Sequence, residues 1–304
     1  MSAATTAVKA DGSDTIVAVL GLGAMGLPMA IRLAGAYTVR AFDIFAERTE
    51  LAVAGGAVAA ASPAEAAAGA AAVLVSVRDH TQFESAMFGD GGAAPALAPG
   101  SLVILTSTIG TDAVKQSAAK LAELDILLLD APVSGGAVRA AAGDLMFMVG
   151  GPAASIETAR PILDVLASTV HLVGENPGDG QTMKTVNQLL CGIHTAAAGE
   201  ALALASSLGL DPDTVISVLG SGAAASFMLG DRGPRMAERL RDETPLLRSR
   251  LDIISKDMGI VHTLARRAGV ATPIAAAAEQ VYLGMEGRGF AAEDDSIVVV
   301  SDRL

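Results

Sequence analysis

The glycine-rich segment Gly21–Gly26 constrains the fold more than any other feature of this sequence. It directly follows the β-rich apolar run Ile16–Leu20, and a helix-compatible segment begins near Leu27. In a strand–turn–helix of this kind, the first glycine permits a tight turn, the second admits a pyrophosphate and the third lets the helix pack on the strand. The helix N-terminus adds amide donors and a positive dipole. We therefore predict a dinucleotide-binding turn formed by Gly21, Leu22, Gly23, Ala24, Met25 and Gly26.

The first half of the chain alternates short apolar runs with Ala-rich segments of helical length. The runs are apolar on both faces, as in a parallel sheet covered by helices on both sides. This pattern predicts an α/β Rossmann domain over residues 15–173. The predicted strands are 16–20, 39–42, 73–77, 102–105 and 126–129, with two more at 147–149 and 170–173 flanking a helix at 153–166.

From Gly178 onward the pattern is helical. Residues 182–208 contain no Pro and carry Ala, Leu and Met at helical spacing, which predicts one long helix. Gly209 is typical of a helix stop, and Asp211-Pro212 of a new start. Further helices are predicted at 212–219, 234–241, 247–268 and 274–285. We thus expect a flexible N-terminus at 1–14 and an all-α domain at 174–304 that begins with a long interdomain helix.

Length and composition limit the classes of protein to consider. The 304 residues suit two domains, and 51% hydrophobic residues with a mean hydropathy of +0.48 exclude general disorder. The net charge of −12 disfavours nucleic acid and anionic membranes as partners. Cys191 is the single cysteine, and the Ala-rich segment 66–77 is too short to span a bilayer. We expect a soluble, cytoplasmic protein in a reducing compartment.

Asp43 closes the second predicted strand about 20 residues beyond the glycines, where a carboxylate can accept hydrogen bonds from an adenosine ribose. It would also repel a 2′-phosphate, so NAD is favoured over NADP. Arg48 is the nearest basic residue that could pair with such a phosphate. The alternative is an ordinary aspartate at a strand end.

Three further segments carry polar side chains in patterns that suit a small anionic ligand. Lys184 shares a helix face with Asn187, Gln188 and Cys191, although such a lysine is more often a solvated surface charge. The turn at 134–136 offers a hydroxyl and approachable backbone amides, which suit a carboxylate but also an ordinary glycine turn. By itself, a lysine at 256 beside an aspartate indicates a solvated ion pair on a helix.

Four ordered motifs give a more specific indication. They are Val19–Gly26 with Pro28-Met29-Ala30, Asp130–Gly136 followed by Gly143–Gly151, Gly178–Asn187, and Lys256–Gly259. Through them nearly the whole chain resembles the β-hydroxyacid dehydrogenase family, which includes 3-hydroxyisobutyrate dehydrogenase, tartronate semialdehyde reductase and 6-phosphogluconate dehydrogenase. The resemblance implies an α/β Rossmann domain followed by an all-α substrate and dimerisation domain like that of 6-phosphogluconate dehydrogenase, with cofactor and substrate in the cleft between them.

The resemblance also assigns roles to individual residues. Lys184 falls on the catalytic lysine, which exchanges a proton with the substrate hydroxyl, and Asn187 on a substrate-contacting asparagine. The turn Ser134, Gly135 and Gly136 falls on the segment that holds the substrate carboxylate and hydroxyl. The cofactor contacts fall on Val77, Arg78, Gln82, Thr108 and Lys256. No metal is implied, and His171, His194 and His262 are expected to be structural. His194 lies one helical turn beyond Cys191, and the other two have no acidic or Cys partner at ligand spacing.

Within the family, Gln188–His194 and Asp294-Asp295-Ser296 resemble most the L-threonate dehydrogenase branch, although many members of that branch carry His at the position of Asn187. This implies NAD-dependent oxidation of a small hydroxycarboxylic acid such as L-threonate. The alternatives are 3-hydroxyisobutyrate dehydrogenase, tartronate semialdehyde or glyoxylate reductase, and a nucleotide-binding relative without chemistry. Imine reductases share the architecture but typically differ at position 184. The apolar helical second half suggests a homodimer or homotetramer.

Overall fold

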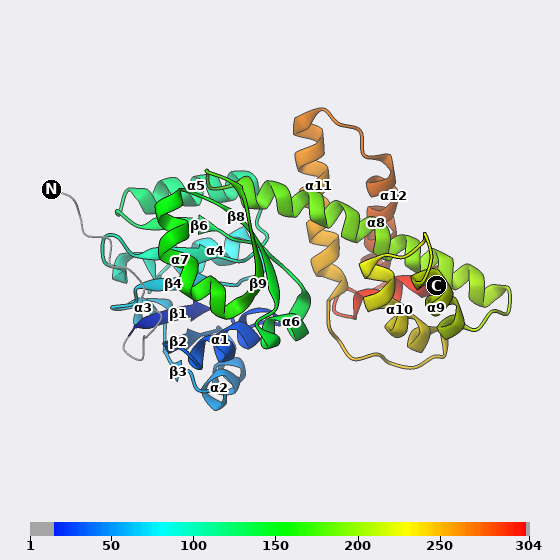
Figure 1. Ribbon diagram of the computed structural model, residues 1–304, viewed down its shortest axis with the longest axis horizontal. Coiled ribbons are helices and arrows are strands. Elements are labelled where there is room, and N and C mark those ends of the chain that lie inside the picture. Colours follow the sequence, from blue (N-terminus) through cyan, green and yellow to red (C-terminus); the bar gives the residue numbers. More distant parts are fainter. Residues whose placement is uncertain (1–14, 302–304) are drawn as a thin grey trace. The chain divides into compact units, whose positions relative to one another are not determined.

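The computed structural model describes residues 15–301 (Figure 1). The predicted flexible segment 1–14 lies outside the described residues. Contacts divide the chain into two compact units, one ending at Lys184 and the other starting at Thr185.

The first unit is built on a twisted sheet whose main part is parallel. Its strands follow the order β3-β2-β1-β4-β5-β6, and β1, β4 and β5 are buried almost throughout. Burial on both faces explains why the sequences of these strands are continuous apolar runs. The bounds are β1 Ile16–Leu20, β2 Thr38–Phe42, β3 Val58–Ala59, β4 Ala72–Val75, β5 Leu102–Leu105 and β6 Leu127–Asp130. The predicted α/β Rossmann architecture is confirmed.

One edge of the sheet departs from the parallel pattern. β8 (Leu145–Gly150) pairs antiparallel with β6 and with the two-residue strand β7 (Val133–Ser134), whereas β9 (Ala167–Gly174) runs parallel to β8. The link from β7 to β8 holds only the short helix α6 (Gly136–Ala142), and short links favour antiparallel neighbours. β8 and β9 are joined through the helix α7, which allows a parallel pair.

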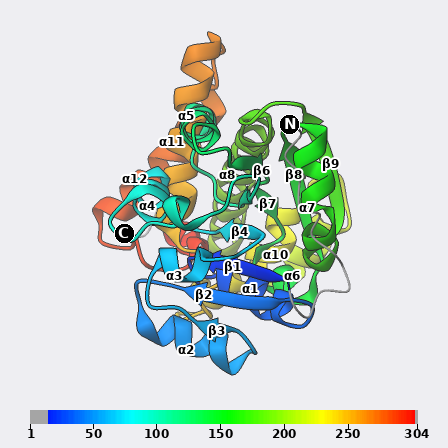
Figure 2. The same cartoon turned by 90° about the vertical axis from the view of Figure 1, so that its left-hand side faces the viewer.

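Helices cover both faces of this sheet, and alternate residues of β1 belong to different cores. Val17 and Val19 pack with α1 and α7, whereas Ala18 and Leu20 pack with α3, α4 and α5. Figure 2 shows α7 and β9 at the edge of the sheet opposite to α2 and β3. The helices are α1 Gly26–Ala34, α2 Ala46–Ala54, α3 Pro63–Ala67, α4 His80–Phe88, α5 Thr111–Ala122 and α7 Ala153–Leu166.

The second unit is helical, as predicted, around a core that includes Met258 and Tyr282. The predicted helix start at Pro234 is wrong: α10 begins at Phe227, where the Ser226 hydroxyl accepts a hydrogen bond from the Leu229 amide, and Pro234 lies inside the helix. The elements are α8 Asp179–Ser207, which begins in the first unit, α9 Pro212–Gly220, α10 Phe227–Leu240, α11 Leu251–Ala268, α12 Pro273–Gly287 and the 3₁₀ helix η2 Asp295–Val300.

Ion pairs join α10 to the residues around the start of η2. Arg235 lies 2.9 Å from Asp294, and Arg232 lies 3.0 Å from Asp295. Both aspartates are 1% exposed, and hydrogen bonds with backbone amides and with Arg235 hold the pKa of Asp294 below its usual value despite burial. The Asp294–Ser296 motif therefore has a packing role in this structure.

Candidate active site

The glycines of the dinucleotide-binding turn have three different environments. Gly21 has a φ of +87°, and a Cβ there would stand 2.4 Å from the Ser76 carbonyl oxygen. A Cβ at Gly26 would stand 1.8 Å from the Gly21 carbonyl oxygen, whereas a Cβ at Gly23 would meet nothing within 4 Å. The outer glycines are thus required by packing, and the middle one borders open space. This cradle fits the pyrophosphate of a dinucleotide.

Asp43 lies directly beside this turn and is 8% exposed. Its carboxylate accepts hydrogen bonds from the backbone amides of Leu22 at 2.6 Å and Phe45 at 2.9 Å. Arg48 lies 3.5 Å from the same carboxylate, with its guanidinium 4.5 Å from the centre of the Phe45 ring. The site therefore combines an acceptor for ribose hydroxyls with a neighbouring cation.

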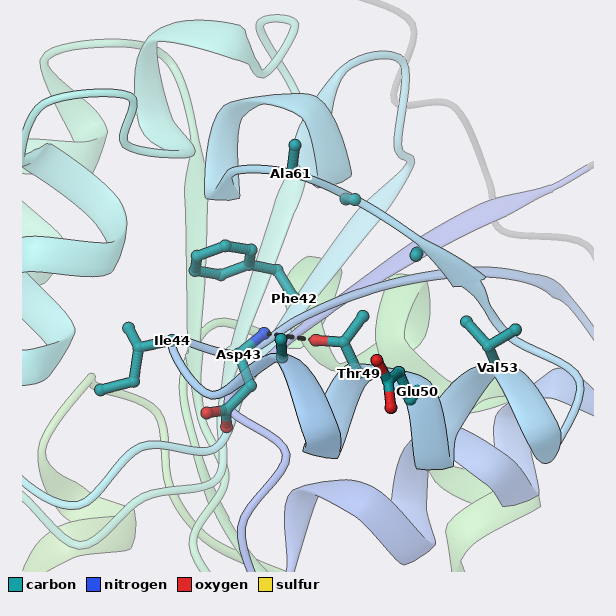
Figure 3. A pocket seen from close by; sticks show the side chains of 10 residues that line it. Phe42, Asp43, Ile44, Thr49, Glu50, Val53 and Ala61 are labelled. Carbon is teal, nitrogen blue, oxygen red and sulfur yellow. Dashed lines mark hydrogen bonds between the residues drawn. The ribbon is translucent and has the colours of Figure 1, made fainter.

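A pocket of about 570 Å³ opens next to Asp43, between the end of β2 and α2 (Figure 3). The Asp43 amide donates a hydrogen bond to the Thr49 hydroxyl at 3.3 Å, which joins the strand end to the helix. The volume is in the range of small-molecule sites. Sequence analysis identified only Asp43 here, because most other lining residues are small or apolar and carry no chemical signal. The lining includes Phe42, Ile44, Thr49, Glu50, Val53 and Ala61.

The loops after β4 and β5 are joined by hydrogen bonds. The Val77 amide donates to the Ser107 hydroxyl at 2.8 Å, and the Arg78 amide donates to Gln82 Oε1 at 3.0 Å. Val77, Arg78 and Gln82 therefore belong to one local structure, and Ser107 connects it to the residue before Thr108. Their contact with a cofactor stays a prediction.

The first half of α8 has an inverted pattern of burial. Gln181, Lys184, Thr185 and Gln188 are 0%, 8%, 4% and 9% exposed, and their spacing places them on one face. The opposite face exposes the apolar side chains of Met183, Val186 and Leu190. α8 has the length and hydropathy of a membrane-spanning helix, and core helices of soluble proteins share both properties. A buried polar stripe is unusual on a helix because each buried polar group needs a hydrogen-bond partner, and this stripe includes the predicted catalytic residue Lys184.

The turn after β7 has the backbone that the carboxylate hypothesis requires. Gly135 and Gly136 have φ values of +139° and +74°, which favour glycine. A Cβ at Gly136 would meet nothing within 4 Å. Ser134, half-buried at the end of β7, lies immediately before this open turn.

In the second unit, a chain of polar contacts links Asn187 to Lys256. The Asn187 amide donates to Gln188 Oε1 at 2.9 Å, and Gln188 Nε2 donates to Asp257 Oδ2 at 2.5 Å. Lys256 Nζ lies 2.8 Å from Asp257 Oδ1. Since Asp257 is only 4% exposed, the interpretation of this pair as solvated is wrong. Sequence analysis gave Gln188 and Asp257 no role because 69 residues separate them.

One expectation about the histidines also needs correction. His262 on α11 lies 2.7 Å from the Glu279 carboxylate on α12, so it does have an acidic partner. The contact joins two helices and is invisible to local spacing. Among residues 15–301, no cluster of three or more His, Cys, Asp and Glu side chains could hold a metal ion.

Comparisons with known proteins agree with these features. Residues 16–174 match the NAD binding domain of 6-phosphogluconate dehydrogenase, and residues 178–301 match the family described as NAD-binding of NADP-dependent 3-hydroxyisobutyrate dehydrogenase. The chain therefore belongs to the 3-hydroxyisobutyrate dehydrogenase-like family of β-hydroxyacid dehydrogenases, NAD(P)-dependent enzymes that act on CH–OH groups. The predictions of family and enzyme class are confirmed.

Individual relatives span nearly the whole chain. The L-threonate dehydrogenase of Cupriavidus necator is 40% identical over 93% of this chain and 94% of its own length, and that of Escherichia coli K12 is 36% identical over 95% of each. The NAD-dependent L-serine dehydrogenase of Pseudomonas aeruginosa is 32% identical over 93% and 96%. The crystal structure of a 3-hydroxyisobutyrate dehydrogenase from Salmonella typhimurium superposes with a TM-score of 0.87 at 36% identity, covering 94% of this chain and 99% of that one.

Proposed function

We propose that this β-hydroxyacid dehydrogenase uses NAD to oxidise a small hydroxycarboxylic acid, with L-threonate as the first candidate. The observation that carries the proposal is the buried polar face of α8 centred on Lys184. The L-threonate dehydrogenases at 36–40% identity support the choice of substrate. The reverse reaction, reduction of the matching oxo acid, uses the same groups.

The residues predicted to bind the substrate and to transfer the proton each have one task in this reaction. The Ser134 hydroxyl and the amides of Gly135 and Gly136 bind the substrate carboxylate. Asn187, whose amide is oriented by Gln188, binds the substrate on the same helix face as Lys184. Lys184 removes the hydroxyl proton as the carbon becomes a carbonyl. Bound NAD supplies the hydride acceptor.

The preference for NAD rests on Asp43, whose carboxylate borders the glycine turn and would repel a 2′-phosphate. Arg48 is the feature that favours the alternative, because its guanidinium could turn from Asp43 to a 2′-phosphate. The preference is therefore expected to be marked and not absolute.

The alternatives differ in substrate and not in reaction class. They are oxidation of 3-hydroxyisobutyrate, and reduction of tartronate semialdehyde or glyoxylate. We also infer a homodimer or homotetramer, because the apolar face of α8 with Met183, Val186 and Leu190 is exposed in the single chain.

A substrate panel tests the proposal. Purified protein is assayed for reduced-cofactor absorbance with NAD or NADP and L-threonate, 3-hydroxyisobutyrate, L-serine and 2-(hydroxymethyl)glutarate, and in reverse with glyoxylate and tartronate semialdehyde. We expect the highest kcat/KM for L-threonate with NAD. Faster turnover of another acid by tenfold or more would overturn the substrate assignment and leave the reaction class intact.

A further inference from the structure

A single buried amide joins the start of α8 to the backbone on both sides of Thr108. Gln181 Oε1 accepts hydrogen bonds from the backbone amides of Ile109 at 2.9 Å and Gly110 at 3.1 Å, and Gln181 Nε2 donates to the Ser107 carbonyl at 3.0 Å. The Ser107 carbonyl and the Ile109 amide belong to the two peptide groups that flank Thr108. Gln181, which is fully buried, therefore fixes the backbone of that residue from both directions.

The same amide also reaches the end of β6. Gln181 Nε2 donates to Asp130 Oδ1 at 2.8 Å, and Asp130 Oδ2 accepts from the backbone amides of Gly178 and Gln181, both at 2.9 Å. Asp130 is the last residue of β6 and lies four residues before Ser134. The pair thus ties together the loop after β5, the end of β6 and the first turn of α8.

The segment from Gly178 to Gly180 makes this approach sterically feasible. Gly178 has a φ of +101°, and a Cβ at Gly180 would stand 2.7 Å from the Met148 carbonyl oxygen and 2.9 Å from Asp130 Oδ2. Any larger residue at position 180 would push the helix start away from the carboxylate. The positive φ at position 178 and the close packing at position 180 therefore explain why both residues are glycine. Their spacing in the sequence alone did not reveal this.

Only one orientation of the Gln181 amide satisfies its partners. The amides of Ile109 and Gly110 can only donate, so they require the oxygen, and the Ser107 carbonyl can only accept, so it requires the nitrogen. The ionised Asp130 carboxylate takes the remaining hydrogen. A change of charge or of hydrogen-bonding type at position 181 or 130 therefore leaves a buried polar group without its partner.

Burial also affects the protonation of the Asp130 carboxyl group. Burial raises the pKa of Asp130 to about 6, although hydrogen bonds from Gln181, Gly178 and Gly180 act in the opposite direction. Because the folded state holds its proton to a higher pH than the unfolded state does, this group's contribution to stability is present at low pH and is lost as pH rises from 3.8 through about 6.

We propose that Gln181 and Asp130 are positioning residues, which set the place of Lys184 and Thr108 for hydride and proton transfer. Lys184 lies three residues after Gln181 on the same face of α8, so displacement of this anchor moves both segments. The inference rests on the proposed acid/base role of Lys184. Since a shift of about 1 Å can lower a rate about 100-fold, we expect Gln181→Met to lower kcat about 10- to 100-fold. Cofactor affinity should change little, because the glycine turn and Asp43 are untouched.

A double-mutant cycle tests whether Gln181 acts through Lys184. The value of kcat is compared for the wild type, Gln181→Met, Lys184→Ala and the double variant, with the acid that the panel turns over fastest. If Gln181 acts through Lys184, the loss caused by Gln181→Met disappears in the Lys184→Ala background. If the loss of kcat in the double variant equals the product of the two single losses, the positioning role is overturned. Near-normal turnover of Lys184→Ala alone would instead overturn the proposed acid/base, so the two failures are distinct.

A second variant decides the question if Gln181→Met folds poorly. Gln181→Glu keeps the length and the acceptor for Ile109 and Gly110 but places a second carboxylate oxygen against Asp130, and such a pair tends to share one proton. We expect the ratio of its kcat to that of the wild type to rise as pH falls. Gln116→Glu, on the exposed side of α5, is the matched control and should show a constant ratio. A constant ratio for folded Gln181→Glu would overturn the inference.

Discussion

The dinucleotide-binding turn and the first half of α8 are built in opposite ways. The turn is formed by backbone: two of its glycines are required by close packing, and the third borders the open space for the ligand. The first half of α8 presents side chains, with Gln181, Lys184, Thr185 and Gln188 buried on one face and Met183, Val186 and Leu190 exposed on the other. A site formed by backbone depends on glycines at fixed spacing, whereas a site formed by side chains depends on partners far away in the chain.

This difference predicts how the two sites will respond to substitution. At Gly23, a single added methyl group changes the space for a ligand without displacing any protein atom. On α8, loss of one side chain leaves several buried partners unsatisfied, since Gln181 alone meets two other loops. We therefore expect substitutions in the turn to alter cofactor affinity and substitutions on α8 to alter kcat.

The largest effect is expected at Lys184. General acid/base groups contribute about 10²- to 10⁴-fold, so Lys184→Ala should lower kcat by that order while the Kd for NAD changes little. Lys184→Arg should fail nearly as badly, because guanidinium stays protonated at any working pH. Steady-state kinetics and isothermal titration calorimetry with NAD measure the two quantities. A folded Lys184→Ala protein with near-normal turnover would show that α8 does not carry the acid/base.

The sequence predicted the backbone-built part of the molecule well. The strand–glycine–helix order placed β1 and α1 correctly because local spacing determines such a turn, and Asp43 was located by its distance from it. Gln181 lay within a recognised motif without an assigned function, because its partners are 51 and 71–74 residues away. The strand predicted at 147–149 lies within β8, but its antiparallel direction was not predicted, since strand direction depends on the connection and not on the apolar pattern.

Gly23→Ala tests the backbone-built site next. An added methyl group in a space used by a ligand costs about 1–3 kcal/mol, so the Kd for NAD should rise about 5- to 150-fold. The melting temperature should be unchanged, because a Cβ at Gly23 meets no protein atom within 4 Å. Gly26→Ala is the matched variant, and it should lower the melting temperature because its Cβ would overlap the Gly21 carbonyl oxygen. If Gly23→Ala and Gly26→Ala had the same melting temperature and Gly23→Ala left the Kd for NAD unchanged, the case for a pyrophosphate at this turn would be lost.

The carboxylate anchor at Ser134–Gly136 should have an intermediate effect. Hydrogen bonds to a charged group contribute about 1.5–3 kcal/mol, so the methyl ester of the best acid should show kcat/KM about 10- to 100-fold lower. Initial rates with the acid and its ester at equal concentration provide the measurement. Equal rates would mean that the glycine turn after β7 has only a structural role.

The smallest effect concerns the choice between NAD and NADP, where side chains supplement the backbone-built turn. An ion pair with one solvent-exposed partner, here Arg48, contributes about 0.2–1 kcal/mol, so Asp43→Ala should shift the ratio of kcat/KM values for NAD and NADP toward NADP by about 2- to 5-fold. Arg48→Ala should shift the same ratio by a similar factor toward NAD, because it removes the cation that lies 3.5 Å from Asp43. Shifts of this ratio in opposite directions would show that Asp43 disfavours a phosphate at the 2′ position of the cofactor and that Arg48 favours it. Shifts in the same direction would mean that both residues only support the turn, and cofactor choice would then have to come from the wider pocket between β2 and α2.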